Sequence, residues 1–135
     1  MLAIDLRGRV ALVTGASRGI GAAVAKALAA SGASVTVNYR AGAEAAAAVV
    51  QHIEAAGGRA TAWQADVCDA AAVAAMVEGI VGREGRLDIL VNNAGIIRDA
   101  LVPEMAPADW QAVLDTNLSG AFHCARLAAR PMIRQ

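Results

Sequence analysis

Short apolar runs alternate with longer alanine-rich segments along the chain. Each run is brief and almost continuously hydrophobic, as expected for a strand that is buried on both faces of a parallel sheet. No linker rich in proline or serine divides the pattern, so the alternation indicates consecutive βαβ units in one domain. The runs predict four strands, at residues 9–13, 34–39, 60–64 and 87–92.

The segments between these strands have helical character. The first carries an apolar stripe at helical spacing, formed by Ile20, Val24, Ala27 and Leu28. This helix should end at residues 31–32, where a serine precedes a glycine, because glycine favours helix C-termini. A second helix is expected at residues 43–56, before two glycines, and a third after Asp69, a good N-cap residue, fading over residues 79–85.

A longer helical stretch begins at Pro107. One of its faces is apolar and contains Trp110, Val113, Leu114, Leu118, Ala121, Phe122 and Ala125. Such a face packs in a core or in an interface between subunits. The predicted fold is therefore an α/β doubly wound parallel sheet, with about four strands followed by a long helix.

Composition and charge narrow the possible functions. The chain has 135 residues, of which 57% are hydrophobic, and this suits one domain with a core. Acidic and basic residues number 12 each, so no long-range field recruits nucleic acid or an anionic membrane. Residues 1–7 lack the apolar region of a signal peptide, and no apolar stretch reaches the roughly 18 residues of a membrane-spanning helix. We therefore expect a cytoplasmic protein.

The cysteines and histidines show no pattern of a metal site. Cys68 and Cys124 are far apart and form no Cys-x-x-Cys motif, which indicates reduced thiols rather than a disulfide framework. His52 and His123 are equally isolated and lack the i, i+4 spacing that places two imidazoles on one metal. We expect no bound metal.

The sequence TGASRGIG, residues 14–21, follows the first predicted strand directly. A strand that leads through glycines into a helix presents free backbone N–H groups and the positive end of a helix dipole, which together favour phosphate. The spacing Gly15-x-x-x-Gly19-x-Gly21 differs from the Gly-x-Gly-x-x-Gly fingerprint, and no Lys-Ser/Thr pair follows as in a Walker loop. Taken alone, the turn could be an ordinary connection that needs left-handed glycines.

Polar residues follow two other predicted strands. Asn92-Asn93-Ala94-Gly95 lies at the carboxyl end of the fourth strand, where doubly wound sheets bind their ligands, although the segment could also be a simple turn. Asp66 comes just after the third strand, in the sequence Ala-Asp-Val. Its carboxylate could accept a hydrogen bond from an adenine amino group, or it could be a turn or capping residue.

Asn117 falls on the apolar stripe of the final helical stretch. An amide that is carried into a buried face costs free energy unless it is hydrogen-bonded. We therefore expect a partner for its side chain, and a backbone carbonyl or a water at a helix kink would serve.

The end of the second strand indicates which dinucleotide would bind. An NAD site usually has an acidic residue there, about twenty residues beyond the glycines, to bind the ribose hydroxyls. This chain has Asn38-Tyr39-Arg40 instead, and Arg18 lies inside the glycine turn. Two guanidinium groups suit a 2′-phosphate, so NADP(H) is predicted over NAD(H), unless Arg40 is only a solvated loop charge.

Together and in this order, these motifs resemble the short-chain dehydrogenase/reductase family over essentially the whole chain. The segments NNAGIIRD and DWQAVLDTNLSGAF are similar to the 3-oxoacyl-[acyl-carrier-protein] reductases and the related acetoacetyl-CoA reductases. The resemblance implies a Rossmann-type sheet, a single NAD(P)-binding domain over residues 1–135, and a proton-relay role for Asn117. The predicted cofactor-binding residues are Gly15, Ser17, Arg18, Gly19, Ile20, Gly21, Asn38, Arg40, Asp66, Val67, Asn93, Ala94 and Gly95.

The resemblance implies NADPH-dependent reduction of a 3-oxoacyl thioester to the 3-hydroxyacyl thioester. The family's proton donor is the tyrosine of a Tyr-x-x-x-Lys motif that follows a serine, whereas Tyr39 and Lys26 are the only residues of their types here and form no such motif. By this resemblance the chain is the cofactor-binding half, without the catalytic half, and should not turn over alone. Another short-chain dehydrogenase of sugars, steroids or alcohols, a non-catalytic dinucleotide-binding module, and an incomplete reading frame are the alternatives.

Two expectations concern association. In the family's strand order a fifth strand covers residues 87–92, so without it this edge should make the isolated chain marginally stable, prone to aggregate, or able to pair with another copy. Full-length relatives usually form tetramers through the helix that here contains residues 122–130, so a homo-oligomer is expected for the longer protein.

Overall fold

The computed structural model describes residues 3–135, so the start of the segment that we compared with a signal peptide, Met1 and Leu2, lies outside the described residues. A four-stranded parallel sheet has the order β3-β2-β1-β4. Its strands are β1 (Val10–Val13), β2 (Ser34–Tyr39), β3 (Arg59–Gln64) and β4 (Ile89–Val91). All four predicted strands are present, and the predicted Rossmann-type α/β fold is confirmed.

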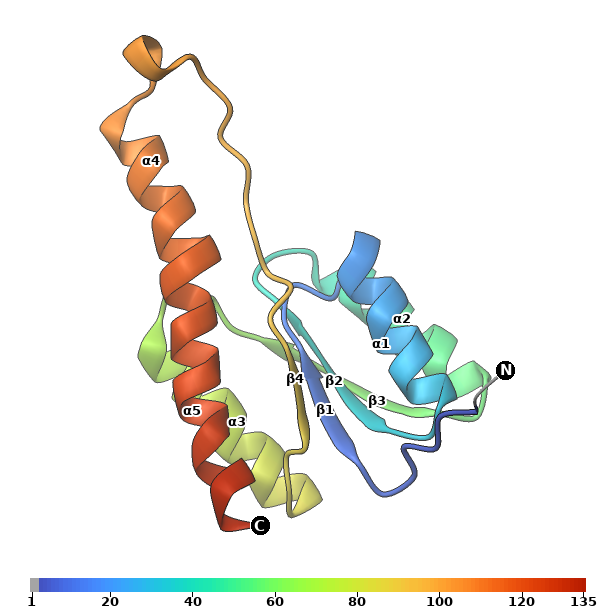
Figure 1. Ribbon diagram of the computed structural model, residues 1–135. Helices are drawn as coiled ribbons and strands as arrows, with labels where there is room; N and C mark the ends of the chain where they lie inside the picture. The colour runs from blue at the N-terminus through green and yellow to red at the C-terminus, as the bar shows by residue number, and fades with distance from the viewer. Residues whose placement is uncertain (1–2) are drawn as a thin grey trace.

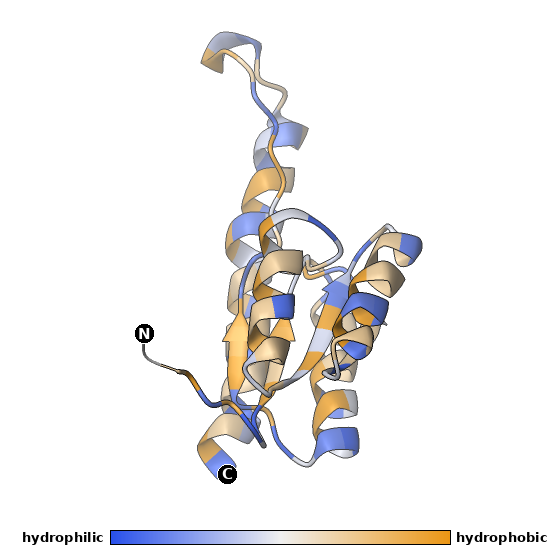
Figure 2. Ribbon diagram, turned by 90° about the vertical axis from the view of Figure 1, so that its right-hand side faces the viewer, coloured by the Kyte–Doolittle hydropathy of each residue, from blue (hydrophilic) through white to orange (hydrophobic). Residues whose placement is uncertain are grey.

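Helices cover both faces of this sheet (Figure 1). α1 (Gly19–Ala30) and α2 (Ala43–Ala55) pack on one face, and α3 (Ala70–Glu84) and α5 (Gly120–Arg134) pack on the other. Figure 2 shows hydrophobic residues along the strands between the two helical layers. None of the helices within residues 3–135 is both long and apolar enough to cross a membrane.

The connection from β4 to α5 is long and leaves the sheet. It contains a short 3₁₀ turn (Val102–Glu104), α4 (Pro107–Leu114) and a π-helical turn (Asp115–Ser119). α4, the π-helical turn and α5 form one continuous column that extends beyond the carboxyl ends of the strands (Figure 1).

The helix boundaries agree with the predicted capping residues. Asp69 caps α3, because its carboxylate accepts hydrogen bonds from Ala71 N at 3.0 Å and Ala72 N at 3.1 Å. α3 does not fade over residues 79–85 but continues to Glu84 and ends at Gly85, whose φ is 79°. Glycine adopts this left-handed conformation without a steric penalty.

The predicted stripe of α1 is only partly correct. Val24 and Leu28 pack against the core, but Ile20 is 77% exposed and Ala27 is also exposed. The buried residues of this helix are instead Gly21, Ala22, Ala25 and Ala29. Small side chains face the sheet because they let the helix approach it closely. A prediction based on hydrophobicity misses them, because isoleucine is more hydrophobic than alanine or glycine.

The apolar stripe of the final helical stretch does not face this chain's core. Trp110, Leu118 and Phe122 are 58%, 66% and 60% exposed, so the prediction that they are core residues is wrong. The buried positions are Thr116, Gly120, Cys124 and Ala128. Their position is the physical reason: α4 extends beyond the carboxyl ends of the strands and has no buried residue, and Leu118 and Phe122 each lie two residues, about half a turn, from the positions that face the core. The alternative that this stripe is a subunit interface stays a prediction.

β4 lies at the edge of the described sheet, and its three residues are half-buried. Just before it, the Gln135 side chain bonds both main-chain groups of Leu87. Its Oε1 accepts from Leu87 N at 3.1 Å, and its Nε2 donates to Leu87 O at 2.8 Å. The instability and self-association expected from this edge stay predictions.

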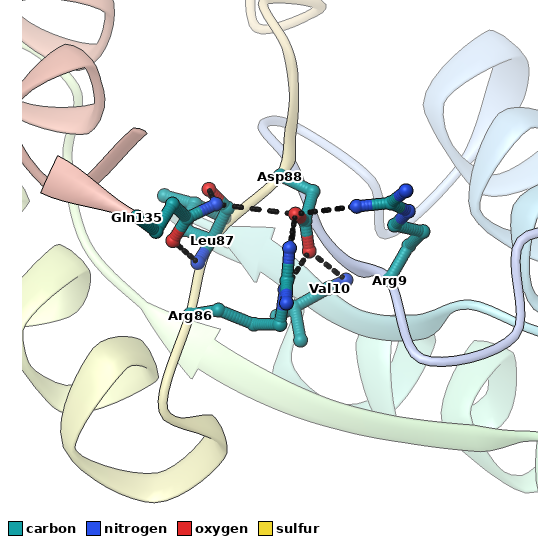
Figure 3. Close-up of polar contacts among 6 residues, drawn as sticks. All are labelled: Arg9, Val10, Arg86, Leu87, Asp88 and Gln135. Carbon is teal, nitrogen blue, oxygen red and sulfur yellow. Dashed lines mark hydrogen bonds and ion pairs between the residues drawn. The ribbon is translucent and has the colours of Figure 1, made fainter. Parts of the chain in front are cut away.

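A carboxylate ties the start of β4 to the start of β1 (Figure 3). Asp88 accepts hydrogen bonds from Val10 N at 2.9 Å, from Arg86 Nε at 2.8 Å and from Gln135 Nε2 at 3.1 Å, and Arg9 lies at 3.4 Å. The Arg86 guanidinium is the main cause that lowers the pKa of Asp88 from 3.8 to about 2, with further help from the Val10 amide.

Asp88 should therefore make unfolding depend on pH. Because the folded pKa is depressed, the stabilisation is complete above about pH 4 and is lost as the pH falls through 2. We expect Asp88→Asn to lower the free energy of unfolding by about 1–2 kcal/mol at pH 7, allowing for solvent screening at the arginines. Urea denaturation of both proteins from pH 7 to pH 2.5 should show this difference shrinking below pH 4.

The matched control is Asp109→Asn, which removes an exposed carboxylate 3.7 Å from Arg98 Nε. Exposed pairs of this kind contribute little, so its unfolding curves should follow those of the wild type. A difference between wild type and Asp88→Asn that stayed constant with pH would contradict the assignment.

Candidate functional site

The predicted site residues meet at the carboxyl ends of the strands, around a cavity of about 230 Å³. Its wall includes most of the residues that we predicted to bind a cofactor: Gly15, Ser17, Arg18, Asn38, Arg40, Asp66, Val67, Asn93, Ala94 and Gly95. Tyr39, Ala41, Ala65, Ile96 and Thr116 complete it. Four of the predicted site residues lie outside this wall, namely Gly19, Ile20, Gly21 and Asn117.

The glycine turn has the conformation that only glycine adopts readily. Gly15 and Gly19 both have φ of 59°, in the left-handed region. A Cβ on Gly15 would lie 2.9 Å from Ala94 Cα, so the first glycine is required by close packing. A Cβ on Gly19 would meet no atom within 4 Å, and no side chain caps the N-terminus of α1. The start of this helix is therefore open to an anionic ligand.

Thr14 and Asn93 join the glycine turn to the segment after β4. Thr14 Oγ1 accepts hydrogen bonds from the main-chain N–H groups of Asn93 and Ala94, both at 3.0 Å. Asn93 Nδ2 donates to the carbonyls of Thr14 and Gly15, also at 3.0 Å. Asn93 thus fixes the turn. Sequence reasoning gave Thr14 no role, although a threonine directly after an all-apolar strand could have indicated one.

The buried side chain of Asn38 links the glycine turn to the end of β3. Its side chain is 1% exposed, its Oδ1 accepts from Gly15 N at 3.2 Å, and its Nδ2 donates to Trp63 O at 3.2 Å and Ala65 O at 3.1 Å. Asn38 lines the cavity, and its amide binds main-chain groups of the fold, so the predicted contact with a cofactor stays a prediction. The residue therefore positions the glycine turn relative to β3.

Asp66 combines the two alternatives that the sequence left open. Its Oδ1 accepts from Cys68 N at 2.9 Å, as in a turn-forming aspartate, while the residue also lines the cavity. Within residues 3–135, Oδ2 has no hydrogen-bond partner in the protein. One carboxylate oxygen is therefore available to a ligand.

Asn117 is exposed, so the prediction that it lies in a buried face is wrong. Its Oδ1 accepts from Ile96 N at 2.8 Å, and its Nδ2 donates to Ile96 O at 3.0 Å. The expectation that a backbone carbonyl satisfies this amide at a helix irregularity is confirmed, since Asn117 lies in the π-helical turn. A Cβ on Gly95 would lie 3.3 Å from Asn117 Oδ1, which explains the glycine beside it.

The sequence profile of a family described as short chain dehydrogenase matches residues 9–135. The chain belongs to the short-chain dehydrogenase family. This membership confirms the resemblance that the motifs indicated.

Relatives within the short-chain dehydrogenases are close. A 3-oxoacyl-[acyl-carrier-protein] reductase of Synechocystis sp. is 51% identical over 130 residues, which are 96% of this chain and 53% of that protein. A reductase of the same name from Staphylococcus aureus is 51% identical over 125 residues, covering 93% and 51%. A short chain dehydrogenase from Burkholderia cenocepacia, solved in complex with NADP, is 48% identical with a TM-score of 0.91, covering 95% of this chain and 52% of that one. The chain spans about half the length of these relatives.

Within residues 3–135, this short-chain dehydrogenase has no lysine in the cavity wall to pair with a tyrosine. Tyr39 lines the cavity, whereas Lys26 lines a separate one between α1 and α2. Both cysteines are free thiols. Burial raises the pKa of Cys124 to about 11, which keeps it protonated, and burial is also the main cause that raises the pKa of Cys68.

Two arginines at the cavity carry charge that the fold does not neutralise. Neither Arg18 nor Arg40 forms an ion pair within residues 3–135, and both are exposed. The Arg18 guanidinium lies beside Gly42, at the turn that follows Arg40, since a Cβ there would be 3.1 Å from its terminal nitrogen. Asp66 is the one acidic residue in the cavity wall. The arginine side of the cavity therefore favours an anionic group.

Proposed function

We propose that this chain binds NADP(H) and forms the cofactor half of a reductase that converts 3-oxoacyl thioesters to 3-hydroxyacyl thioesters. The observation that carries the proposal is the cavity at the strand ends, where the glycine turn, Asp66 and residues 93–95 converge. Its fit to a dinucleotide rests on the open space at Gly19, the uncapped start of α1 and the free Asp66 oxygen.

Different residues of the cavity would bind different parts of the cofactor. The start of α1 would bind the pyrophosphate through main-chain N–H groups, and Asp66 would accept a hydrogen bond at the adenine. Arg18 and Arg40 would bind the 2′-phosphate, which makes NADP(H) the expected cofactor. Residues 93–95 would flank the nicotinamide ribose. The bound nicotinamide supplies the hydride.

The substrate class follows from the relatives that are named 3-oxoacyl-[acyl-carrier-protein] reductases. Hydride addition to the C3 carbonyl leaves an alkoxide that needs a proton. Asn117 is proposed to support the proton relay, but the tyrosine and lysine of the family are not among these 135 residues. We therefore propose binding without turnover for the chain alone, and tetramers and a cytoplasmic location for the longer protein.

Binding and catalysis are tested separately. Fluorescence titration of the chain with NADPH and NADH should show binding of NADPH with the higher affinity. The longer protein, expressed from the complete gene, should then oxidise NADPH in the presence of an acetoacetyl thioester. Absence of NADPH binding would exclude the proposal. Reduction of sugars, steroids or alcohols instead would identify another short-chain dehydrogenase, and binding without any reduction would identify a non-catalytic module.

Removal of the two arginines should remove the preference for NADPH over NADH. We expect Arg18→Ala/Arg40→Ala to weaken NADPH binding by about 10- to 100-fold, because two charge-assisted contacts to the 2′-phosphate are lost. NADH affinity should stay within about twofold, since it lacks that phosphate. The measurement is a fluorescence titration at fixed ionic strength, because salt screens such contacts.

The control for this double variant is Arg126→Ala, which removes an exposed arginine on α5 that does not line the cavity. It should leave both affinities unchanged. If NADPH and NADH affinities fell in parallel in the double variant, the arginines would not recognise the 2′-phosphate.

A further inference from the structure

The helical column formed by α4, the π-helical turn and α5 contacts the loop after β3 at Val67 and Cys68, through hydrogen bonds from two of its side chains. His123 Nδ1 donates a hydrogen bond to Val67 O at 3.0 Å, across 56 positions of sequence. Thr116 Oγ1 lies 3.3 Å from Cys68 Sγ, across 48 positions. The two contacts reach consecutive residues of the loop, Val67 and Cys68, which directly follow Asp66.

The helix also approaches this loop closely. A Cβ on Gly120 would lie 2.6 Å from Val67 Cγ2, so the helix backbone packs directly on the valine side chain. Val67 is 5% exposed. The main chain of the loop therefore has one surface against the helix and the other against the cavity.

The hydrogen bond from His123 acts on the peptide unit that orients Asp66. This unit joins Val67 to Cys68, and His123 binds its carbonyl oxygen while Asp66 Oδ1 binds its N–H at 2.9 Å. Rotation of the peptide would break both bonds and release the carboxylate. The direction of the free carboxylate oxygen is thus linked to the position of the helix.

We propose that His123 is a positioning residue for the nucleotide end of the cavity. Its Nδ1–H fixes the Val67 carbonyl, and through the Val67–Cys68 peptide it fixes Asp66 toward the adenine. Thr116 assists by holding the Cys68 side chain. The inference rests on the proposed dinucleotide site and adds a residue that does not itself line the cavity.

Two substitutions of the same histidine separate the hydrogen bond from simple packing. His123→Asn places an amide N–H near the position of Nδ1 and keeps a donor for Val67 O. His123→Leu keeps comparable bulk and removes the donor. Thr116→Val is a third variant, which removes the hydroxyl beside Cys68 and keeps the shape of the side chain.

The first measurement is amide hydrogen exchange of residues 67–69 in the protein made from its own coding sequence, without nucleotide. His123→Leu should speed exchange of the Cys68 amide by about 3- to 10-fold, the effect of one lost neutral hydrogen bond. His123→Asn should stay within about twofold of the wild type, and Thr116→Val should fall between them.

The second measurement is affinity for two halves of the cofactor. His123→Leu should weaken binding of 2′,5′-ADP and NADPH by about 3- to 10-fold and leave binding of reduced nicotinamide mononucleotide unchanged. Equal exchange and equal 2′,5′-ADP affinity in His123→Leu and His123→Asn would overturn the positioning role. A wild-type protein that bound neither 2′,5′-ADP nor NADPH would overturn the proposed function, while the exchange data would still decide whether His123 anchors the loop.

Discussion

Asn38→Leu is expected to lower the free energy of unfolding by about 3–5 kcal/mol and to eliminate measurable NADPH binding. The substitution removes the side-chain partner of Gly15 N–H, Trp63 C=O and Ala65 C=O, three main-chain groups that are buried or partly buried. Each unsatisfied buried group costs about 1–3 kcal/mol. Because the amide of Gly15 belongs to the glycine turn, the turn would also lose its orientation. Urea denaturation followed by circular dichroism measures the first effect, and a fluorescence titration measures the second.

Thr36→Val is the matched control for this experiment. Thr36 lies on the same strand as Asn38 and has the same exposed fraction of 1%. Its hydroxyl accepts one long hydrogen bond, from Arg83 at 3.4 Å. The nearly isosteric valine should cost less than about 1 kcal/mol. If both variants were equally destabilised, general sensitivity of β2, rather than the three hydrogen bonds of Asn38, would explain the loss.

Much of the fold could be predicted because buried parallel strands have a strong local signature. β2 has the predicted bounds, and β1 and β3 each differ from the prediction by one residue at their start. β4 is shorter than predicted, at Ile89–Val91. Beyond it the main chain leaves the sheet, and Asn93 N donates to Thr14 Oγ1. That contact joins residues 79 positions apart and has no local sequence signal.

The buried faces of two helices could not be predicted in the same way. Alanine and glycine form the buried face of α1, where close approach to the sheet matters more than hydrophobic size. In the last helical stretch, α4 leaves the sheet and buries no residue, and α5 packs through Gly120, Cys124 and Ala128 rather than through its large apolar side chains. Periodicity groups Trp110 and Phe122 on one face, but it does not show that this face points away from the core of this chain.

The site could be predicted as a set of residues but not as a set of roles. Of the three predicted asparagines, Asn38 and Asn93 line the cavity, whereas Asn117 lies outside its wall and binds Ile96, which is part of it. Spacing alone does not show that each amide binds main-chain groups elsewhere in the chain. The role of His123 could not be predicted either, because no motif surrounds it in the sequence and its partner, Val67, is 56 positions away.

Gly21→Ala is expected to open the glycine turn. A Cβ at this position would overlap Asn93 Nδ2 and lie 2.7 Å from Gly15 O, so the two hydrogen bonds from Asn93 to the turn could not both persist. Overpacking costs about 1–3 kcal/mol, and each lost hydrogen bond adds about 0.5–1.5 kcal/mol. We therefore expect about 2–5 kcal/mol less stability, measured by urea denaturation. NADPH affinity should fall by about 100-fold, equivalent to about 2.7 kcal/mol, because the displaced turn would no longer align its main-chain N–H groups with the pyrophosphate.

Gly82→Ala distinguishes this effect from the general consequence of adding a methyl group. Gly82 lies in α3, and a Cβ there would meet no atom within 4 Å. Alanine is a better helix former than glycine by about 0.5–1 kcal/mol, so this variant should be slightly more stable and should bind NADPH normally. If Gly21→Ala retained wild-type affinity, Asn93 would have moved aside without displacing the turn. The contact between Asn93 and the glycine turn would then be dispensable for binding, and the free N–H groups at the start of α1 would suffice.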